Sequence, residues 1–163
     1  MRPVSGNGKF SAELVKRVEA LWERYPDRKA ALLPALHLIQ KERDGWLSDE
    51  TIRDAAELFD VPDMHIKGIV GFYDMFHGQP VGRHVVRLCK TLSCKLRGAD
   101  ELRAHVREKY GVLNGETTAD GRFTFKCFEC LGHCEVAPMM LVDEEKHTEL
   151  TTDKLDAVLE ALA

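Results

Sequence analysis

The feature that most constrains the fold is a change in hydrophobic periodicity near the middle of the chain. Before residue 71 the apolar residues recur every three or four positions, which is typical of amphipathic helices. After residue 84 short runs alternate between apolar and polar residues, which is typical of strands. A segment with glycines and a proline, 71–84, separates the two patterns. We therefore predict a disordered tail over 1–9, a helical module over 10–79 and a mixed domain over 80–163.

The helical module is predicted to contain four short helices. Ser11 is a candidate N-cap for the first, whose apolar stripe runs from Leu14 to Tyr25 and which Pro26 ends. The other three are expected from Asp27 to Asp44, after the cap Ser48, and over 63–70 following Pro62. Short connections between such helices predict a small bundle.

A helix-turn-helix over 48–70 is the alternative reading of the last two helices. The exposed positions of the second helix would be Asp63, His65 and Lys67, which are poorly suited to contacting phosphates or base edges. The formal net charge of the chain is -4, with no basic half. We therefore favour a packing module and expect no nucleic-acid partner.

The second part is predicted to be an α/β layer with a short sheet. Strands are expected at His84–Cys89, 122–128 and 139–142, with an edge strand at 146–150. Helices are expected over 96–110 and 153–162, the last one capped by Thr152. The whole chain is therefore assigned to the α+β class, with a helical bundle followed by a domain built on this sheet.

Four of the five cysteines fall into two tight pairs, Cys89-x4-Cys94 and Cys130-x3-Cys134. Both pairs are expected in loops that follow strands, where one edge of a sheet brings them together. Two facing thiolate pairs suit either one tetrahedral zinc ion or a [2Fe–2S] rhomb with two ligands per iron, and reactive dithiols are a third reading. The N-terminus has no secretory signal, so we expect a reducing compartment in which thiols bind metal.

Local charge favours the cluster over zinc. A helix N-terminus near Cys94 offers unpaired N–H groups to an anionic core. The cations near the first pair are Lys90, Lys95 and Arg97. The loops around a cluster also need close backbone approach and positive φ, which the glycines Gly98 and Gly132 allow.

Two further residues beside the pairs are expected not to bind metal. Cys127 is separated from Cys130 by two residues, a spacing that is also common among metal ligands. It lies on the same face of the predicted strand as two phenylalanines, however, which predicts a side chain in the core. His133 lies between two candidate ligands and could replace one, as histidines do in Rieske centres. With four cysteines present, we expect His133 to be no ligand itself.

Several function classes have no support in the sequence. No glycine-rich phosphate loop follows a strand, and no nucleophile or paired acid and base accompanies the cysteines. The longest apolar run is too short for a transmembrane helix, so no direct membrane contact is expected. We therefore expect neither a nucleotide site nor catalysis in the isolated chain.

Three motifs resemble one family, that of the E subunit of bacterial NADH-quinone oxidoreductase, the thioredoxin-like ferredoxin component of respiratory complex I. They are CKTLSC at 89–94, TTADGRF at 117–123 and ECLGHCEVAP at 129–138, and QKERDGW at 40–46 and VGFY at 70–73 agree with them. The resemblance extends from about residue 10 to the end. It implies a thioredoxin-like domain with a short mixed sheet, in which Cys89, Cys94, Cys130 and Cys134 hold one [2Fe–2S] cluster.

The resemblance also implies a function within a larger complex. The chain would exchange single electrons with the FMN of a partner flavoprotein, the F subunit of NADH-quinone oxidoreductase, which binds FMN and NADH. The complex would be a proton-translocating NADH:quinone oxidoreductase with further subunits in a peripheral arm, on the cytoplasmic face of the cell membrane. The alternatives are the equivalent subunit of an NAD-linked hydrogenase or formate dehydrogenase, and a zinc-stapled binding module.

Two local expectations accompany this resemblance. Thioredoxin-like folds suggest a cis Ala137–Pro138 step near the first cysteine pair. The helical module has no site of its own and is the candidate interface with the flavoprotein. Its expected contacts are the apolar residues Phe72, Tyr73, Met75 and Phe76, which we predict to be exposed.

Overall fold

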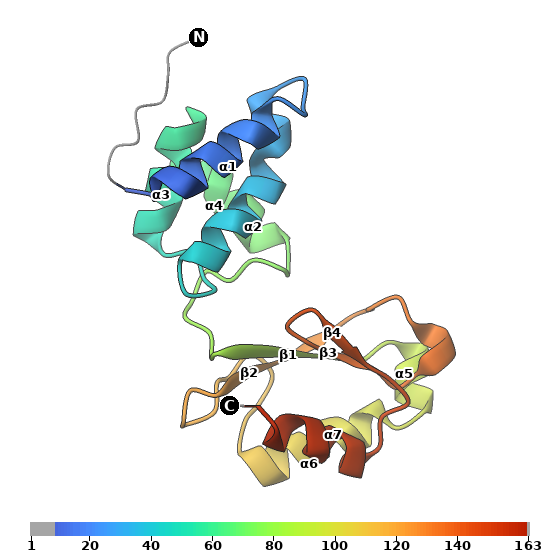
Figure 1. The fold of residues 1–163 in the computed structure, drawn as a ribbon. Helices are drawn as coiled ribbons and strands as arrows, with labels where there is room; N and C mark the ends of the chain where they lie inside the picture. The colour runs from blue at the N-terminus through green and yellow to red at the C-terminus, as the bar shows by residue number, and fades with distance from the viewer. Residues whose placement is uncertain (1–8, 163) are drawn as a thin grey trace. The chain divides into compact units, whose positions relative to one another are not determined.

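A computed structural model describes residues 9–162, and its chain divides into two compact units, Met1–Pro80 and Val81–Ala163 (Figure 1). Residues 1–8 of the predicted tail lie outside the described residues. Each unit has its own apolar core, so each is described separately. None of the helices formed by the described residues is long and apolar enough to cross a membrane.

The first unit is the predicted bundle. Its helices are α1 (Ala12–Trp22), α2 (Leu32–Glu42), α3 (Asp49–Phe59) and α4 (Asp63–Phe72). The expected caps of α1 and α3 are confirmed, because Ser11 Oγ accepts a hydrogen bond from the Leu14 N–H and Ser48 Oγ accepts one from the Thr51 N–H. Each cap satisfies one N–H that has no partner within the helix.

The second helix begins later than the sequence indicated. Asp27 caps a short 3₁₀ turn, η1 (Arg28–Ala31), and α2 begins only at Leu32. Pro34 explains the late start, because a proline lacks an N–H and is tolerated only in the first turn of a helix. The core of the unit is formed by side chains from all four helices, among them Leu14, Leu36, Phe59 and Ile66, together with Leu47 from the connection between α2 and α3.

The second unit is built on a four-stranded mixed sheet with strand order β2-β1-β3-β4. The strands are β1 (His84–Cys89), β2 (Phe123–Phe128), β3 (Met140–Val142) and β4 (Glu145–His147). β1 pairs with β2 in parallel and with β3 antiparallel, and β4 is the predicted edge strand, beginning one residue earlier than expected. The predicted fold class is thus confirmed.

Two of the predicted helical boundaries in this unit are wrong. The single helix expected over 96–110 is divided into α5 (Leu92–Leu96) and α6 (Ala99–Tyr110), because Gly98 adopts a positive φ of 99°. Leu96, the first residue of the expected helix, instead ends α5 and is 78% exposed. The last helix, α7 (Thr152–Glu160), is capped by Thr151 rather than Thr152, since the Thr151 hydroxyl accepts the Lys154 N–H.

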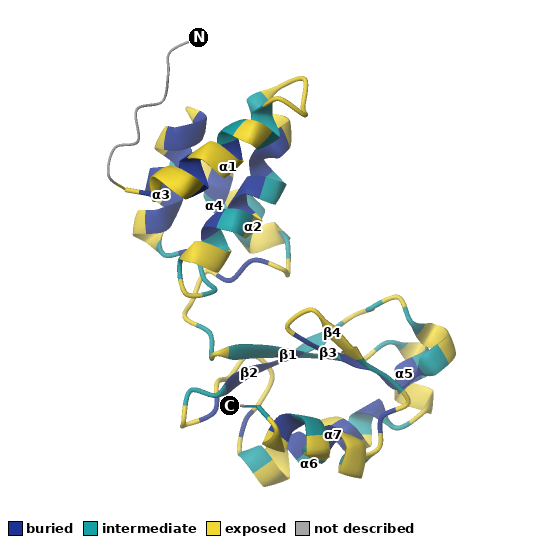
Figure 2. Ribbon diagram, in the orientation of Figure 1, coloured by how far each residue is buried: buried dark blue, intermediate teal, exposed yellow. Residues whose placement is uncertain are grey.

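The core of the second unit lies between the sheet and two helices. α6 and α7 lie on the same side of the sheet, and the residues they turn toward it are buried (Figure 2). Alternation along β1 directs Val86 and Leu88 into this core, together with Phe123 and Phe125 of β2. A smaller cluster at the C-terminal end of β1 contains Cys89, Cys94, Ala99, Ala137 and Met139.

Candidate metal centre

The first cysteine pair lies where β1 ends and α5 begins. Cys89 is the last residue of β1 and Cys94 lies inside α5, and both side chains are buried, with exposed fractions of 2% and 1%. The two sulfur atoms lie within hydrogen-bonding reach of each other. The short turn after β1 therefore folds the predicted pair into one site.

The loop that precedes β3 forms one wall of this site. The Cys89 N–H donates to the Met139 carbonyl oxygen at 3.1 Å, and Arg97 Nη1 donates to the Ala137 carbonyl oxygen at 3.3 Å. Ala137 and Met139 belong to the same buried cluster as Cys89. The Ala137–Pro138 peptide is cis and lies beside the first pair, as predicted.

The second pair lies in the loop between β2 and β3. Cys130 is exposed, and its sulfur accepts the Gly132 N–H at 3.4 Å. Gly132 has the positive φ, 78°, that the sequence led us to expect in this loop. Cys134 is exposed at the start of a 3₁₀ turn, η2 (Cys134–Val136). The negative charge of its thiolate helps to raise the pKa of Cys94. The two loops therefore bring thiols of both pairs to one end of the sheet.

The two buried thiols differ in acidity. Burial opposes ionisation of Cys89, but the N–H groups of Thr91 and Leu131 and the thiol of Cys94 outweigh it and lower the pKa of Cys89. Burial and the neighbouring Cys89 raise the pKa of Cys94 to about 11. Backbone N–H groups aimed at sulfur are what a thiolate ligand needs in a site without water.

The donor set suits iron or another thiophilic metal. All five cysteines are free, and the four paired ones lie at the end of β1, in α5 and in the segment between β2 and β3. Among residues 9–162, no group of three His, Cys, Asp or Glu side chains is already close enough to hold one ion. Each iron of a [2Fe–2S] core takes two thiolates, and the Cys89–Cys94 pair supplies such a unit. The residues present therefore fit a two-iron cluster.

Cys127 lies on the core face of β2, as its position in the alternating pattern predicted. Its side chain is half-buried and packs against the core that β2 shares with the helices, on the side of β2 opposite Lys126 and Phe128. Burial raises the pKa of its thiol. His133 is half-buried, and its Nδ1 lies 3.5 Å from Glu135 Oε1. Neither environment by itself identifies a metal ligand.

The cations that the sequence places near the first pair are held by local contacts. Lys90 Nζ lies 2.7 Å from Glu129 Oε1, and Lys95 Nζ lies 3.4 Å from Asp100 Oδ2. Sequence reasoning missed the exposed leucines on the outer face of α5, whose exposed fractions are 68% at Leu92 and 78% at Leu96. Their i, i+4 spacing around Cys94 was the available signal.

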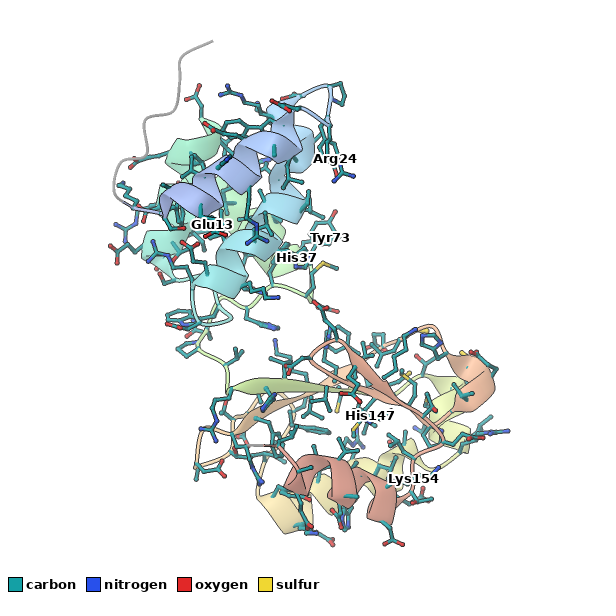
Figure 3. All side chains as sticks on the ribbon, in the orientation of Figure 1. Glu13, Arg24, His37, Tyr73, His147 and Lys154 are labelled. Carbon is teal, nitrogen blue, oxygen red and sulfur yellow. The ribbon has the colours of Figure 1, made fainter. Side chains whose placement is uncertain are left out.

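A group of aromatic and methionine side chains was predicted to be exposed at the end of the helical module. Phe72 is 78% exposed and Met75 39% exposed, whereas Phe76 is buried, which corrects the prediction for that residue. Phe76 packs on the ring of His37 with centroids 4.8 Å apart, and Tyr73 lies on the same side of the unit (Figure 3). The exposed patch is therefore smaller than expected.

Comparison with known proteins agrees with this geometry. Residues 18–163 match the family model described as thioredoxin-like [2Fe-2S] ferredoxin. The second NADH-quinone oxidoreductase E subunit of Rhizobium meliloti is 40% identical over 146 residues, covering 90% of this chain and 86% of the relative. The corresponding E subunit of Escherichia coli K12 is 36% identical over 151 residues, covering 93% and 90%.

A solved structure shares the fold as well. The crystal structure of an NAD+-reducing [NiFe]-hydrogenase superposes with a TM-score of 0.69 at 24% identity, covering 79% of this chain. This chain spans only 21% of that hydrogenase chain, so the likeness concerns the fold alone. The match over most of the chain to the family model and to the curated relatives shows that the protein belongs to the thioredoxin-like [2Fe-2S] ferredoxin family.

Proposed function

We propose that the chain is the [2Fe–2S] electron-transfer subunit of an NADH:quinone oxidoreductase, with Cys89, Cys94, Cys130 and Cys134 as the cluster ligands. The observation that carries the proposal is the juxtaposed thiols of Cys89 and Cys94 facing the loop of the second pair, in a chain of this family. When bound, the cluster supplies a store for one electron. We assign neither Cys127 nor His133 to the ligands.

The polypeptide holds and tunes the site. The N–H groups of Thr91 and Leu131 point at the sulfur of Cys89, and the Gly132 N–H points at that of Cys130. Such hydrogen bonds favour the charged thiolate and, by stabilising negative charge, favour the reduced state of a cluster. Burial of the first pair excludes water from one side of the site.

The partner we propose is the flavoprotein that binds NADH and FMN, called the F subunit in such enzymes. NADH delivers two electrons as a hydride and the cluster stores one, so a flavin is needed to separate the pair. The exposed side chains of Phe72 and Met75 make the helical unit a candidate contact. Proton translocation and the peripheral arm on the cytoplasmic face of the membrane would belong to the whole complex.

Two alternatives are open to direct test. The shared fold with the NAD+-reducing hydrogenase supports the equivalent subunit of an NAD-linked hydrogenase, and the equivalent subunit of a formate dehydrogenase is tested beside it. A zinc-stapled module without redox function is the second. Purification of the native complex, with assays for quinone, hydrogen and formate turnover, separates the parent enzymes.

The decisive experiment is anaerobic purification of the chain with counts of iron and sulfide. We expect two irons and two sulfides per chain, a visible absorption spectrum, and an EPR signal after reduction with dithionite. Colourless protein with one zinc per chain would contradict the proposal, since zinc thiolates do not absorb visible light.

A further inference from the structure

Arg97 differs from the other two cations near the first cysteine pair, because no carboxylate is paired with it. Lys90 Nζ lies 2.7 Å from Glu129 Oε1. Lys95 Nζ lies 3.4 Å from Asp100 Oδ2. Among residues 9–162, no ion pair joins Arg97 to a carboxylate. Of these three cations, Arg97 is therefore the one whose positive charge the described side chains leave without a partner.

The helix that carries Cys94 also places Arg97 on the side of the site. Arg97 is the C-cap of α5, three residues after Cys94, and its N–H donates to the Cys94 carbonyl oxygen at 3.2 Å. Residues three apart in a helix lie on one face, with Cβ atoms about 5 to 6 Å apart. The face of α5 that directs the buried Cys94 into the site therefore also carries Arg97.

A hydrogen bond holds the Arg97 guanidinium against the wall of the site. Its Nη1 donates to the Ala137 carbonyl oxygen at 3.3 Å. Ala137 is buried and belongs to the same cluster of side chains as Cys89, Cys94 and Met139. A backbone carbonyl oxygen accepts the hydrogen bond but carries no net charge. The positive charge of Arg97 therefore stays beside the first cysteine pair without being neutralised there.

Other charged side chains around the site are exposed and paired. Arg103 Nη2 lies 3.3 Å from Asp100 Oδ1, and both side chains are close to half exposed. Glu135, in the loop of the second pair, is exposed, and its Oε1 lies 3.5 Å from His133 Nδ1. Solvent and salt screen charges of this kind, so they act weakly on a buried site. Arg97 is also an exposed residue, but its bond to a buried carbonyl oxygen keeps the guanidinium at the site.

We propose that Arg97 raises the reduction potential of the [2Fe–2S] cluster by holding a positive charge beside the first cysteine pair. The inference rests on the proposed function, because it requires a cluster bound by the four paired cysteines. One-electron reduction adds a negative charge to a site that is already anionic, and a fixed cation close to it favours the reduced state. Arg97 need not touch the metal, since its charge acts through space from the Ala137 carbonyl oxygen.

A redox titration of the full-length chain with its cluster, followed by EPR, tests this directly. For Arg97→Gln we expect the equilibrium constant for reduction to fall at least about threefold, which lowers the potential of a one-electron couple by about 28 mV. Arg97→Lys keeps the charge and should change that constant by less than about twofold. The matched control is Arg107→Gln, which removes an exposed cation of α6 that also has no ion pair among residues 9–162. Its potential should equal that of the wild type.

Salt gives a second readout, which a purely structural role of Arg97 would not change. The difference in potential between wild type and Arg97→Gln should shrink from low to high salt, because an accessible charge is screened. A difference that is independent of salt would overturn the proposal. So would an unchanged potential or loss of the cluster in Arg97→Gln, or an equal shift in Arg107→Gln or Arg97→Lys.

The same titration separates this inference from the proposed function. A wild-type chain that gives no EPR signal of a reduced [2Fe–2S] cluster would overturn the proposed function and the role of Arg97 together. A wild-type signal with an unchanged potential in Arg97→Gln would overturn the role of Arg97 alone.

Discussion

The backbone of Met139 bonds to the backbone of Cys89 and also acts on the thiol of Cys94. Its carbonyl oxygen accepts the Cys89 N–H at 3.1 Å, and its own N–H lies toward the sulfur of Cys94. The residue directly after the cis Ala137–Pro138 step thus joins the end of β1 to α5. The first half of the candidate centre is therefore anchored to the C-terminal end of β1, an inner strand of the sheet.

The four candidate ligands are tested by substitution. Serine at Cys89, Cys94, Cys130 or Cys134 should abolish or strongly alter the visible absorbance, because an alkoxide is a poor ligand for iron. Cys127→Ala should keep the full absorbance at a packing cost of about 1 kcal/mol. A colourless Cys127→Ala protein beside a coloured Cys130→Ser protein would contradict the assignment.

The contact between α6 and α7 should depend on Asp156. Burial opposes its ionisation, but hydrogen bonds from Lys109, His105 and Tyr110 outweigh it and lower the pKa of Asp156 to about 2. Asp156→Asn should therefore cost about 1 to 2 kcal/mol at pH 7. Urea unfolding, followed by the circular dichroism of the chain, measures the change.

The pH dependence of that change has a definite sign. A carboxyl group whose pKa is lowered by folding stabilises the folded state above its unfolded pKa, and this contribution disappears as the pH falls from about 4 to about 2. The difference between wild type and Asp156→Asn should shrink over that range. Glu108→Gln on α6 serves as the control and should change stability by less than about 0.5 kcal/mol. A difference that stays constant with pH would contradict the assignment.

Gly98 should be intolerant of a side chain. Its φ of 99° lies in the left-handed region, and a Cβ there would lie 2.7 Å from Glu101 Oε2. Because the end of the Glu101 side chain can move aside, the backbone conformation dominates, and Gly98→Ala should cost about 1 to 2 kcal/mol. Gly98→Asn should cost less, since asparagine tolerates positive φ. Thermal unfolding of the purified variants decides between these outcomes, and an alanine variant as stable as wild type would refute the argument.

Reduction kinetics test the division of labour between the chain and its flavoprotein partner. The isolated chain should be bleached by dithionite but not by NADH, because it has no phosphate-binding fingerprint. Addition of the flavoprotein should permit reduction by NADH if the cluster potential is high enough. Stopped-flow absorbance measures both steps. Rapid bleaching of the isolated chain by NADH would reveal a nucleotide site that the sequence does not show.

Local sequence determined most of the elements. The caps Ser11 and Ser48, the alternation of β2 and the parity of Cys127 each depend on residues within one turn or one strand, so they could be predicted without tertiary structure. The grouping of the candidate ligands into Cys89 with Cys94 and Cys130 with Cys134 also followed from their spacing in the sequence. The family resemblance supplied the cluster type, which spacing alone left open between iron and zinc.

Other features were decided by contacts between distant segments. The burial of Phe76 against the ring of His37 depends on how the end of the helical unit packs on α2, which periodicity does not contain. The sheet register is the clearest case, because Lys126, Arg87, Leu141 and Lys146 come from four strands and are aligned only through strand pairing. A sequence records which face of its own strand a residue occupies, whereas the neighbours across the sheet are fixed only when the strands associate.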